Sequence, residues 1–170
     1  KFSFRKGDLR KFELPKILND VDFVGKLAVL VGEPICKKYP KGEQESNFDA
    51  NINFAKACDK QGIDRDVMTS TCSEYGLGQN QEMLTESDEL QPISLYSETK
   101  VNSEKILLNE LPGLSAVVLR ASTAYGMASR IRFDLLLHQF IYEAWEKKRI
   151  SLYGANSWRP MAHVDDIARA

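Results

Sequence analysis

Short strand-like runs alternate with segments of helical periodicity, and this alternation most constrains the fold of the chain. The strand-like runs lie at residues 21–31, 66–71 and 114–119, and segments with helical spacing lie between them at 47–61 and 94–111. The densely apolar run at 21–31 is typical of a parallel strand that is buried on both faces. Strands that alternate with helices form a parallel sheet. We therefore predict an α/β fold with a doubly wound parallel sheet.

The remaining segments continue this alternation. We predict a short strand at residues 2–4, a short helix within 11–18, a helix at 133–145, a short strand at 150–153 and a helix that begins at Asp165. A polar loop that contains Pro34, Pro40 and Gly42 is predicted before residue 47. A second loop is predicted at 72–92, and loops of that length in compact domains often carry function.

A candidate proton-transfer site lies at the end of the 66–71 strand. Ligands of such sheets bind beyond the carboxyl ends of the strands, and Thr71 lies at that point. Tyr96 and Lys100 lie four residues apart near the start of the next helix, so they share one helix face. A lysine ammonium stabilises a phenolate, which makes the tyrosine a usable base near neutral pH. Thr71 is placed to hydrogen-bond the substrate oxygen that Tyr96 deprotonates.

Composition argues against several other classes of function. The chain has 170 residues, of which 43% are hydrophobic, and this suits one domain with a substantial core. A net charge of −1 gives no support to a nucleic-acid partner, and the apolar runs are too short to cross a membrane. The three cysteines indicate a reducing compartment rather than a disulfide framework, so we expect a cytoplasmic protein. Two widely separated histidines are too few for a metal site, and none is expected.

Seven short motifs follow one another along nearly the whole chain. They are Gly7-Asp8-Leu9, Leu27-Ala28-Val29, Asn47, Thr71-Cys72-Ser73-Glu74-Tyr75-Gly76, Tyr96 with Lys100, Arg120-Ala121-Ser122-Thr123-Ala124-Tyr125-Gly126 and Trp158-Arg159-Pro160-Met161-Ala162-His163-Val164-Asp165-Asp166. In this order they resemble the extended short-chain dehydrogenase/reductases, the NAD-dependent nucleotide-sugar epimerases and dehydratases. Several motifs in one order are far more specific than any single motif. The resemblance implies a Rossmann-like doubly wound fold.

The resemblance also implies roles for individual residues. It implies catalysis by Thr71, Tyr96 and Lys100, with Tyr96 as the base and Lys100 on the cofactor ribose. It implies cofactor contacts from Asp8, Leu9, Leu27, Ala28, Val29, Asn47, Tyr96, Lys100, Ser122 and Thr123. It implies substrate contacts from Thr71, Cys72, Ser73, Thr123 and Arg159, with Arg159 on the nucleotide diphosphate. The implied cofactor is NAD, with NADP left open, and the implied partners are a nucleotide-sugar substrate and a second copy of the chain in a homodimer.

The chain departs from the family pattern at several places. The glycine-rich phosphate loop and the acidic residue that selects NAD over NADP precede the point in the family that matches the first residue here. The family also continues beyond the point that matches the last residue. We therefore interpret residues 1–170 as a partial NAD(P)-binding Rossmann-like domain, without the N-terminal phosphate-loop unit and the C-terminal end of the fold. The sugar-binding part is expected to start within about residues 123–170. Lys26, Val29 and Thr123 stand where the family commonly has His, Ala and Asn.

The residues after Thr71 bear on the reaction that the resemblance implies. Dehydratases of the family place Asp and Glu directly after this threonine, and the related decarboxylases keep a Glu two positions after it. Cys72 and Ser73 occupy those positions here, and Glu74 lies one place further along. This pattern favours a 4-epimerase, which oxidises the C4 hydroxyl transiently, or a keto-reductase, over a 4,6-dehydratase. A non-catalytic NAD(P)-binding or scaffold protein is the alternative of another class, against which the intact Thr71, Tyr96 and Lys100 argue.

Overall fold

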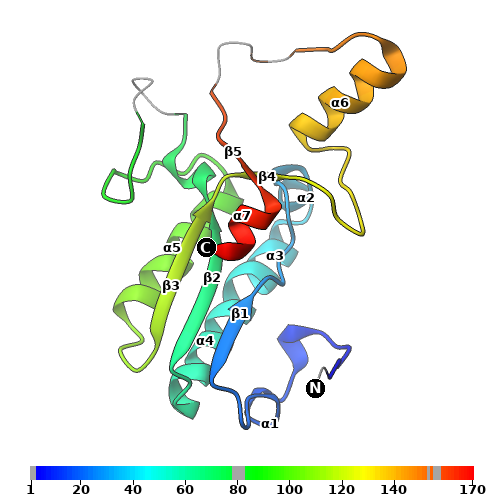
Figure 1. Ribbon diagram of the computed structural model, residues 1–170. Coiled ribbons are helices and arrows are strands. Elements are labelled where there is room, and N and C mark those ends of the chain that lie inside the picture. Colours follow the sequence, from blue (N-terminus) through cyan, green and yellow to red (C-terminus); the bar gives the residue numbers. More distant parts are fainter. Residues whose placement is uncertain (1–2, 78–82, 153, 155–157) are drawn as a thin grey trace. The chain divides into compact units, whose positions relative to one another are not determined.

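The chain forms two compact units (Figure 1). The computed structural model describes residues 3–77, 83–152, 154 and 158–170. The first unit comprises residues 1–76 and 86–120, and the second comprises residues 77–85 and 121–170. The boundary after residue 120 lies close to residue 123, where the sugar-binding part was predicted to begin.

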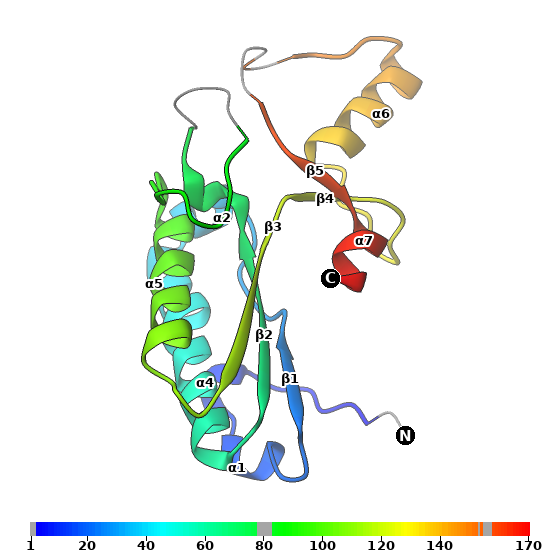
Figure 2. The ribbon, with the colours of Figure 1, turned by 60° about the vertical axis from the view of Figure 1, so that its left-hand side comes forward.

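A three-stranded parallel sheet forms the centre of the first unit. Its strands are β1 (Phe23–Lys26), β2 (Arg65–Thr71) and β3 (Ser115–Ala121), in the order β1-β2-β3. β1 and β2 are parallel, with Val24 opposite Asp66 and Lys26 opposite Met68. Figure 2 shows the three strands running in the same direction, with helices α4 (Ala50–Gln61) and α5 (Leu95–Asn109) on one face. The predicted α/β fold with a parallel sheet is confirmed.

The strand predicted at residues 21–31 is shorter than expected and is not buried on both faces. Only Phe23–Lys26 forms a strand, and the side chains of Phe23, Leu27 and Val31 are 64%, 79% and 50% exposed. Successive side chains of a strand point to opposite faces, and the long helices of the first unit lie on one face (Figure 2). An apolar run does not by itself reveal which of its side chains a neighbouring element covers.

The N-terminal segment matches the prediction in part. A 3-10 helix, η1 (Leu9–Lys11), is followed by the short helix α1 (Leu14–Ile17), so the helix predicted within residues 11–18 is confirmed. The predicted strand at 2–4 is wrong for residues 3 and 4, which pair with no strand, and Phe4 is 76% exposed. Residue 2 lies outside the described residues.

The polar loop predicted before residue 47 is helical instead. Helices α2 (Glu33–Lys38) and α3 (Pro40–Glu43) are followed by a π-helix, η2 (Gln44–Asp49), which continues into α4. Pro34 and Pro40 lie in the first turns of α2 and α3, where a proline has no intrahelical hydrogen bond to lose. The prolines therefore begin helices here rather than interrupt them.

Helix α4 ends, and helix α5 begins, at residues whose types favour helix ends. α4 ends at Gly62, whose φ of 73° lies in the left-handed region that favours glycine. At the start of α5, the Ser94 side chain accepts a hydrogen bond from Ser97 N, and the Ser97 hydroxyl accepts one from Ser94 N. This capping box fixes the start of α5 and so places Tyr96 and Lys100 in its first two turns.

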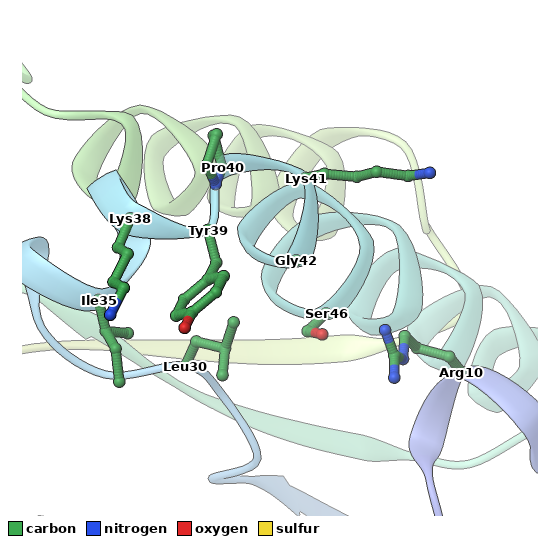
Figure 3. A pocket seen from close by; sticks show the side chains of 9 residues that line it. All are labelled: Arg10, Leu30, Ile35, Lys38, Tyr39, Pro40, Lys41, Gly42 and Ser46. Carbon is green, nitrogen blue, oxygen red and sulfur yellow. The ribbon is translucent and has the colours of Figure 1, made fainter.

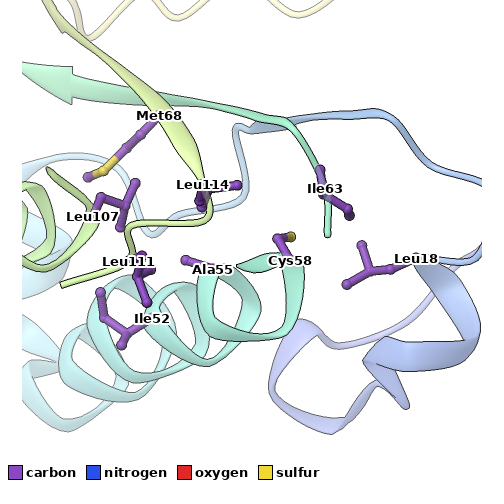
Figure 4. Packing of buried hydrophobic residues seen from close by; sticks show 9 residues of the cluster. All are labelled: Leu18, Ile52, Ala55, Cys58, Ile63, Met68, Leu107, Leu111 and Leu114. Atoms are coloured by element: carbon purple, nitrogen blue, oxygen red, sulfur yellow. The ribbon is translucent and has the colours of Figure 1, made fainter. Parts of the chain in front are cut away.

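The apolar core of the first unit lies between the sheet and the helices α4 and α5 (Figure 4). Its buried side chains come from both helices, from β2 and from the segments that flank the strands: Leu18, Ile52, Ala55, Cys58, Ile63, Met68, Leu107, Leu111 and Leu114. Burial is the main cause that raises the pKa of the Cys58 thiol to about 11. Cys58 is therefore a neutral packing residue.

The second unit contains a two-stranded parallel sheet. Its strands are β4 (Thr123–Tyr125) and β5 (Met161–His163), and its helices are α6 (Leu136–Lys147) and α7 (Val164–Arg169). The helices predicted at 133–145 and from Asp165 are confirmed to within a few residues. The strand predicted at 150–153 is wrong for residues 150–152, and residue 153 lies outside the described residues. Within the described ranges, no helix has the length and apolar character that a membrane span requires.

Candidate active site

β2 ends in the loop that carries the predicted catalytic threonine. Thr71, the last residue of β2, accepts a hydrogen bond from Ser73 N at 3.2 Å, and its hydroxyl lies 2.7 Å from Ser73 Oγ. The chain then turns through a 3-10 helix, η3 (Cys72–Tyr75), at the start of the predicted 72–92 loop. Thr71, Cys72 and Ser73 are all partly exposed, so this strand end presents a pair of hydrogen-bonded hydroxyl groups to the surroundings.

Helix α5 brings Lys100 against the same strand end. Lys100 Nζ donates a hydrogen bond to the carbonyl oxygen of Thr69 at 2.7 Å, two residues before Thr71. Tyr96 lies one helical turn earlier, and Lys100 Nζ is 5.9 Å from the centre of its ring. The structure therefore packs the helix that carries Tyr96 and Lys100 onto the end of the strand that carries Thr71.

Lys100 is a buried charge among other buried charges. Its side chain is 3% exposed, and this burial lowers the pKa of its ammonium group. The negative charge of Glu43 acts in the opposite direction, and the positive charge of Lys26 acts with burial. A buried lysine beside a tyrosine at a strand end, with a perturbed pKa, is typical of a functional site.

Glu43 is a buried residue that the sequence interpretation missed. Its Oε1 accepts a hydrogen bond from Thr99 Oγ1 at 2.6 Å, and its Oε2 accepts one from Asn47 Nδ2 at 2.5 Å. Thr99 directly precedes Lys100 on α5, so Glu43 ties the segment before α4 to the helix that carries Tyr96 and Lys100. The four-residue spacing of Glu43 and Asn47 was the available signal, because it places both side chains on one helix face.

A second buried carboxyl group lies in the segment that follows Thr71. Glu74, in η3, is fully buried, and Ser70 Oγ donates a hydrogen bond to its Oε1. Its Oε2 lies 3.5 Å from Arg120 Nε. Arg120 is closer to Glu104, with Nη2 at 2.8 Å from Oε2, and it donates a hydrogen bond to Tyr75 Oη at 2.9 Å. This cluster links η3, α5 and the end of β3.

Lys26 and Asp66 form a third buried charged contact. Lys26 Nζ lies 2.9 Å from Asp66 Oδ2, and the two side chains are 5% and 0% exposed. Lys26 directly precedes the segment 27–29 that was predicted to pass the cofactor. The lysine that replaces the common His of the family is therefore an internal ion-pair residue in this structure.

Asn47 fixes the chain just after the predicted cofactor-binding segment. Its Oδ1 accepts a hydrogen bond from Leu30 N at 2.7 Å, and its Nδ2 donates one to the Leu30 carbonyl oxygen at 2.8 Å. Leu27 and Ala28 are exposed and Val29 is partly exposed. Asn47 is 1% exposed and holds both backbone groups of Leu30, so it acts on the shape of this segment.

Asp8 and Leu9 lie at the start of η1. The Asp8 carboxylate accepts hydrogen bonds from the Arg10 backbone at 3.1 Å and from Arg10 Nη2 at 2.7 Å. The hydrogen bonds from the Arg10 side chain are the main cause that lowers the pKa of Asp8 to about 2. Asp8 is therefore ionised at neutral pH and is held against the backbone of η1.

A pocket of about 590 Å³ adjoins both of these segments (Figure 3). Arg10 comes from the Asp8-Leu9 segment, and Leu30 follows the 27–29 segment. Tyr39 and Ile35 add apolar surface, and Figure 3 shows the Tyr39 side chain pointing toward Leu30. The pocket thus borders the two segments that were predicted to contact the cofactor.

The remaining predicted site residues belong to the second unit. Thr123 N donates a hydrogen bond to the Pro160 carbonyl oxygen at 3.2 Å, so the pairing of β4 with β5 brings the Arg159 segment beside Thr123. The Arg159 side chain is exposed, and Ser122 and Thr123 are partly exposed. The structure therefore brings together two of the predicted substrate-contacting segments within this unit.

Both histidines have structural roles. His138 Nε2 accepts a hydrogen bond from Gly126 N at 3.2 Å, and His163 Nδ1 accepts one from Asp165 N at 3.2 Å at the start of α7. In the part of the chain that the structure describes, His, Cys, Asp and Glu side chains form no group of three or more that could hold a metal ion.

The sequence profile of the NAD dependent epimerase/dehydratase family matches residues 1–170. Curated relatives include the uncharacterized UDP-glucose epimerase YtcB of Bacillus subtilis (strain 168), which is 28% identical over 99% of this chain and 54% of its own length. UDP-glucuronate 4-epimerase 2 of Arabidopsis thaliana is 29% identical over 96% of this chain and 40% of its own length. The chain thus spans about half the length of such relatives.

Solved structures agree with the sequence matches. UDP-glucuronic acid 4-epimerase from Bacillus cereus, in complex with UDP-glucuronic acid and NAD, superposes with a TM-score of 0.82. It is 27% identical to this chain, and the match covers 96% of this chain and 52% of that one. The fold described above is therefore similar to that of this NAD-bound 4-epimerase over the matched part.

Proposed function

The chain belongs to the NAD-dependent epimerase/dehydratase family, and on this premise we propose that it is part of an NAD-dependent 4-epimerase of a nucleotide-activated sugar. Its relatives include a UDP-glucose epimerase and a UDP-glucuronate 4-epimerase, so we propose a UDP-sugar as the substrate. A keto-reductase or a 4,6-dehydratase of the same family is the second candidate.

The observation that carries the proposal is the burial of Lys100 against the end of β2, one helical turn from Tyr96. In this arrangement Tyr96 takes the proton of a sugar hydroxyl, and the Lys100 ammonium stabilises the phenolate form of Tyr96. Thr71 binds the same oxygen through its hydroxyl. A proton transfer between positioned groups of this kind contributes about 10²–10⁴ in rate.

The residues of the first unit fit an NAD cofactor. The pocket of Figure 3 adjoins the segments of Asp8-Leu9 and Leu27-Ala28-Val29, and the buried Lys100 offers a cation for ribose hydroxyl groups. NAD, when bound, would supply reversible hydride transfer at the sugar carbon. Asn47 supports the cofactor segment through Leu30, and we propose contacts from Ser122 and Thr123 as well.

The buried position of Glu74 favours epimerisation over dehydration. Elimination of water needs a carboxyl group that reaches the sugar. Cys72 and Ser73 lack one, and Glu74 is fully buried with Oε1 bound to Ser70. We therefore propose that Thr71, Cys72 and Ser73 line the sugar site without general acid–base chemistry from a carboxyl group.

We further propose that the second unit begins the sugar-binding part of the protein. Arg159 is exposed beside β4, where a planar guanidinium is suited to bind a diphosphate through paired hydrogen bonds. Thr123 would contact the sugar from the same unit. A homodimer formed through α4 and α5 completes the proposal, since both helices are long and partly exposed.

Replacement of Tyr96 by Phe tests the proposal. The wild-type protein should interconvert a UDP-hexose with its C4 epimer, as read by NMR of the product. Tyr96→Phe should lower kcat by about 10²–10⁴ while NAD binding persists. Tyr142→Phe, on α6, is the matched control and should leave turnover unchanged. Equal turnover of Tyr96→Phe and wild type would contradict the assignment of the base, and NAD binding without turnover of any UDP-hexose would favour a non-catalytic member.

A further inference from the structure

We propose that Glu74 is the positioning residue of the catalytic loop. As a carboxylic acid that shares one proton with Glu104, it fastens the loop of Thr71 to the helix that carries Tyr96 and Lys100. The inference rests on the proposed roles of these three residues.

The contacts of Glu74 reach three separate elements. Ser70, the residue before Thr71 in β2, donates a hydrogen bond to Glu74 Oε1. Glu104 lies on α5, one turn after Lys100, and its carboxylate binds Arg120 Nη2 at 2.8 Å. Arg120, near the end of β3, also faces Glu74 Oε2 at 3.5 Å. The backbone of Glu74 adds a fourth tie, because its carbonyl oxygen accepts a hydrogen bond from Gln91 N at 2.8 Å.

Charge balance indicates that this pair of carboxyl groups holds a proton. The side chains of Glu74, Glu104 and Arg120 are 0%, 3% and 18% exposed. Glu43, Glu74 and Glu104 act on the Lys100 ammonium, and Glu74 and Glu104 also face Arg120, so three buried carboxylates would share two cations. The uncompensated negative charge is costly, and one shared proton removes it. Among the described residues, Glu74 Oε2 is buried and has no hydrogen-bond partner, so a full negative charge on this carboxyl group would be poorly compensated.

The electrostatic surroundings of Glu74 support the same assignment. Burial, followed by the hydrogen bond with Glu104, raises the pKa of Glu74 to about 8. The hydrogen bond from Ser70 and the charge of Arg120 oppose this rise without cancelling it. Lys100 also faces Glu74 from α5, and Tyr75 faces Arg120 from η3. Glu74 is therefore protonated at neutral pH, and it loses its proton in mildly alkaline solution.

Two substitutions at position 74 separate positioning from simple packing. Glu74→Gln keeps a carbonyl oxygen for Ser70 and supplies an N–H donor for Glu104, so it should retain most of the wild-type kcat. Glu74→Met fills a similar volume but forms neither hydrogen bond. It should lower kcat by about tenfold or more, with a smaller change in KM, because small displacements of catalytic groups are costly. Glu110→Met, at the exposed end of α5, is the matched control.

The pH dependence of kcat separates the positioning role from a packing role, because a packing role would not change it. In the full natural protein, kcat of the wild type should fall above about pH 8, where Glu74 ionises, and Glu74→Gln should lack this fall. The inference is overturned if Glu74→Met keeps the wild-type kcat, if Glu74→Gln loses as much as Glu74→Met, or if Glu74→Gln and wild type share one alkaline profile.

Infrared difference spectroscopy tests whether Glu74 is protonated, and it requires no turnover. The wild type should show the C=O band of a protonated carboxylic acid near neutral pH, and the band should vanish at alkaline pH and in Glu74→Gln. An active wild type without this band contradicts the assignment to Glu74. A wild type that shows the band but converts no nucleotide sugar contradicts the proposed function instead, and the positioning role fails with it.

Discussion

Removal of one partner of the Lys26–Asp66 ion pair should destabilise the protein far more than removal of both. Lys26→Met leaves the Asp66 carboxylate fully buried without its cation, which lies at 2.9 Å in the wild type. Asp66→Val leaves the Lys26 ammonium buried without its anion. The double variant leaves no buried charge at this position.

The expected loss of stability follows from the burial of both side chains. Both side chains face the helices from adjacent strands, since Lys26 lies opposite Met68 of the core and Asp66 is two residues from it. With 5% and 0% exposure, solvent screens the pair little. Breaking a buried pair costs about 3–5 kcal/mol, whereas replacing both partners by apolar residues is neutral or stabilising. A loss of that size is a large part of the 5–15 kcal/mol that typically stabilises a domain.

Urea unfolding of the wild type, both single variants and the double variant measures these free energies. Each single variant should lose about 3–5 kcal/mol, and the double variant should lie within about 1 kcal/mol of the wild type. Lys41→Met is the matched control, because Lys41 forms a surface pair with Glu45 at 3.7 Å and is 90% exposed. Its loss should cost less than about 1 kcal/mol.

Two results would refute this reasoning. A loss below about 1 kcal/mol in Lys26→Met would mean that Asp66 finds water or another partner. A double variant as unstable as the sum of the two single variants would mean that the side chains contribute by packing and not as a charged pair.

Three further measurements test other parts of the structure. Asn47→Ala should weaken NAD binding severalfold in calorimetry, because both backbone groups of Leu30 lose their partner; unchanged affinity would contradict the support role. Gly62→Ala should lower the free energy of unfolding by about 1 kcal/mol, because alanine is strained at a φ of 73°, and it should leave turnover intact. Gly76→Ala should lower the free energy of unfolding further and slow turnover, because its Cβ would also clash with the carbonyl oxygen of Gln91 beside the segment that follows Thr71. Equal effects at the two glycines would contradict this contact. The folded protein keeps the Glu74 proton up to about pH 8, whereas unfolded Glu releases it near 4.5, so the free energy of unfolding should fall as pH rises between these values. Urea titrations at several pH values should show this slope in the wild type, and a slope unchanged in Glu74→Gln would assign it to another group.

Much of the local structure could be predicted from the residues. The helical spacing at 47–61 and 94–111 and the strand-like runs at 66–71 and 114–119 each act within a few neighbouring residues, and each predicted an element that the structure contains. The order of motifs around Thr71 and Tyr96 indicated the family because such motifs are read directly from the chain.

The prediction was wrong where a local signal permits two conformations. Pro34 and Pro40 suit a loop and also suit the first turn of a helix, and the structure uses the second option. The run at 21–31 has the composition of a buried strand, but Leu27 is 79% exposed. The conformation and burial of each of these segments depend on which other elements pack against it, and not on the segment alone.

The sequence by itself determined where β2, β3 and the long helices lie, and its order of motifs indicated the family. Only the tertiary structure decided which charged groups are buried together. Lys100 and Thr69 are separated by 31 residues, and Thr99 and Glu43 by 56. A contact between residues so far apart in the chain produces no periodic sequence pattern around either residue. A buried charge is stable only when the fold places an oppositely charged or hydrogen-bonding partner beside it. The electrostatics of the site are therefore a property of the packed fold.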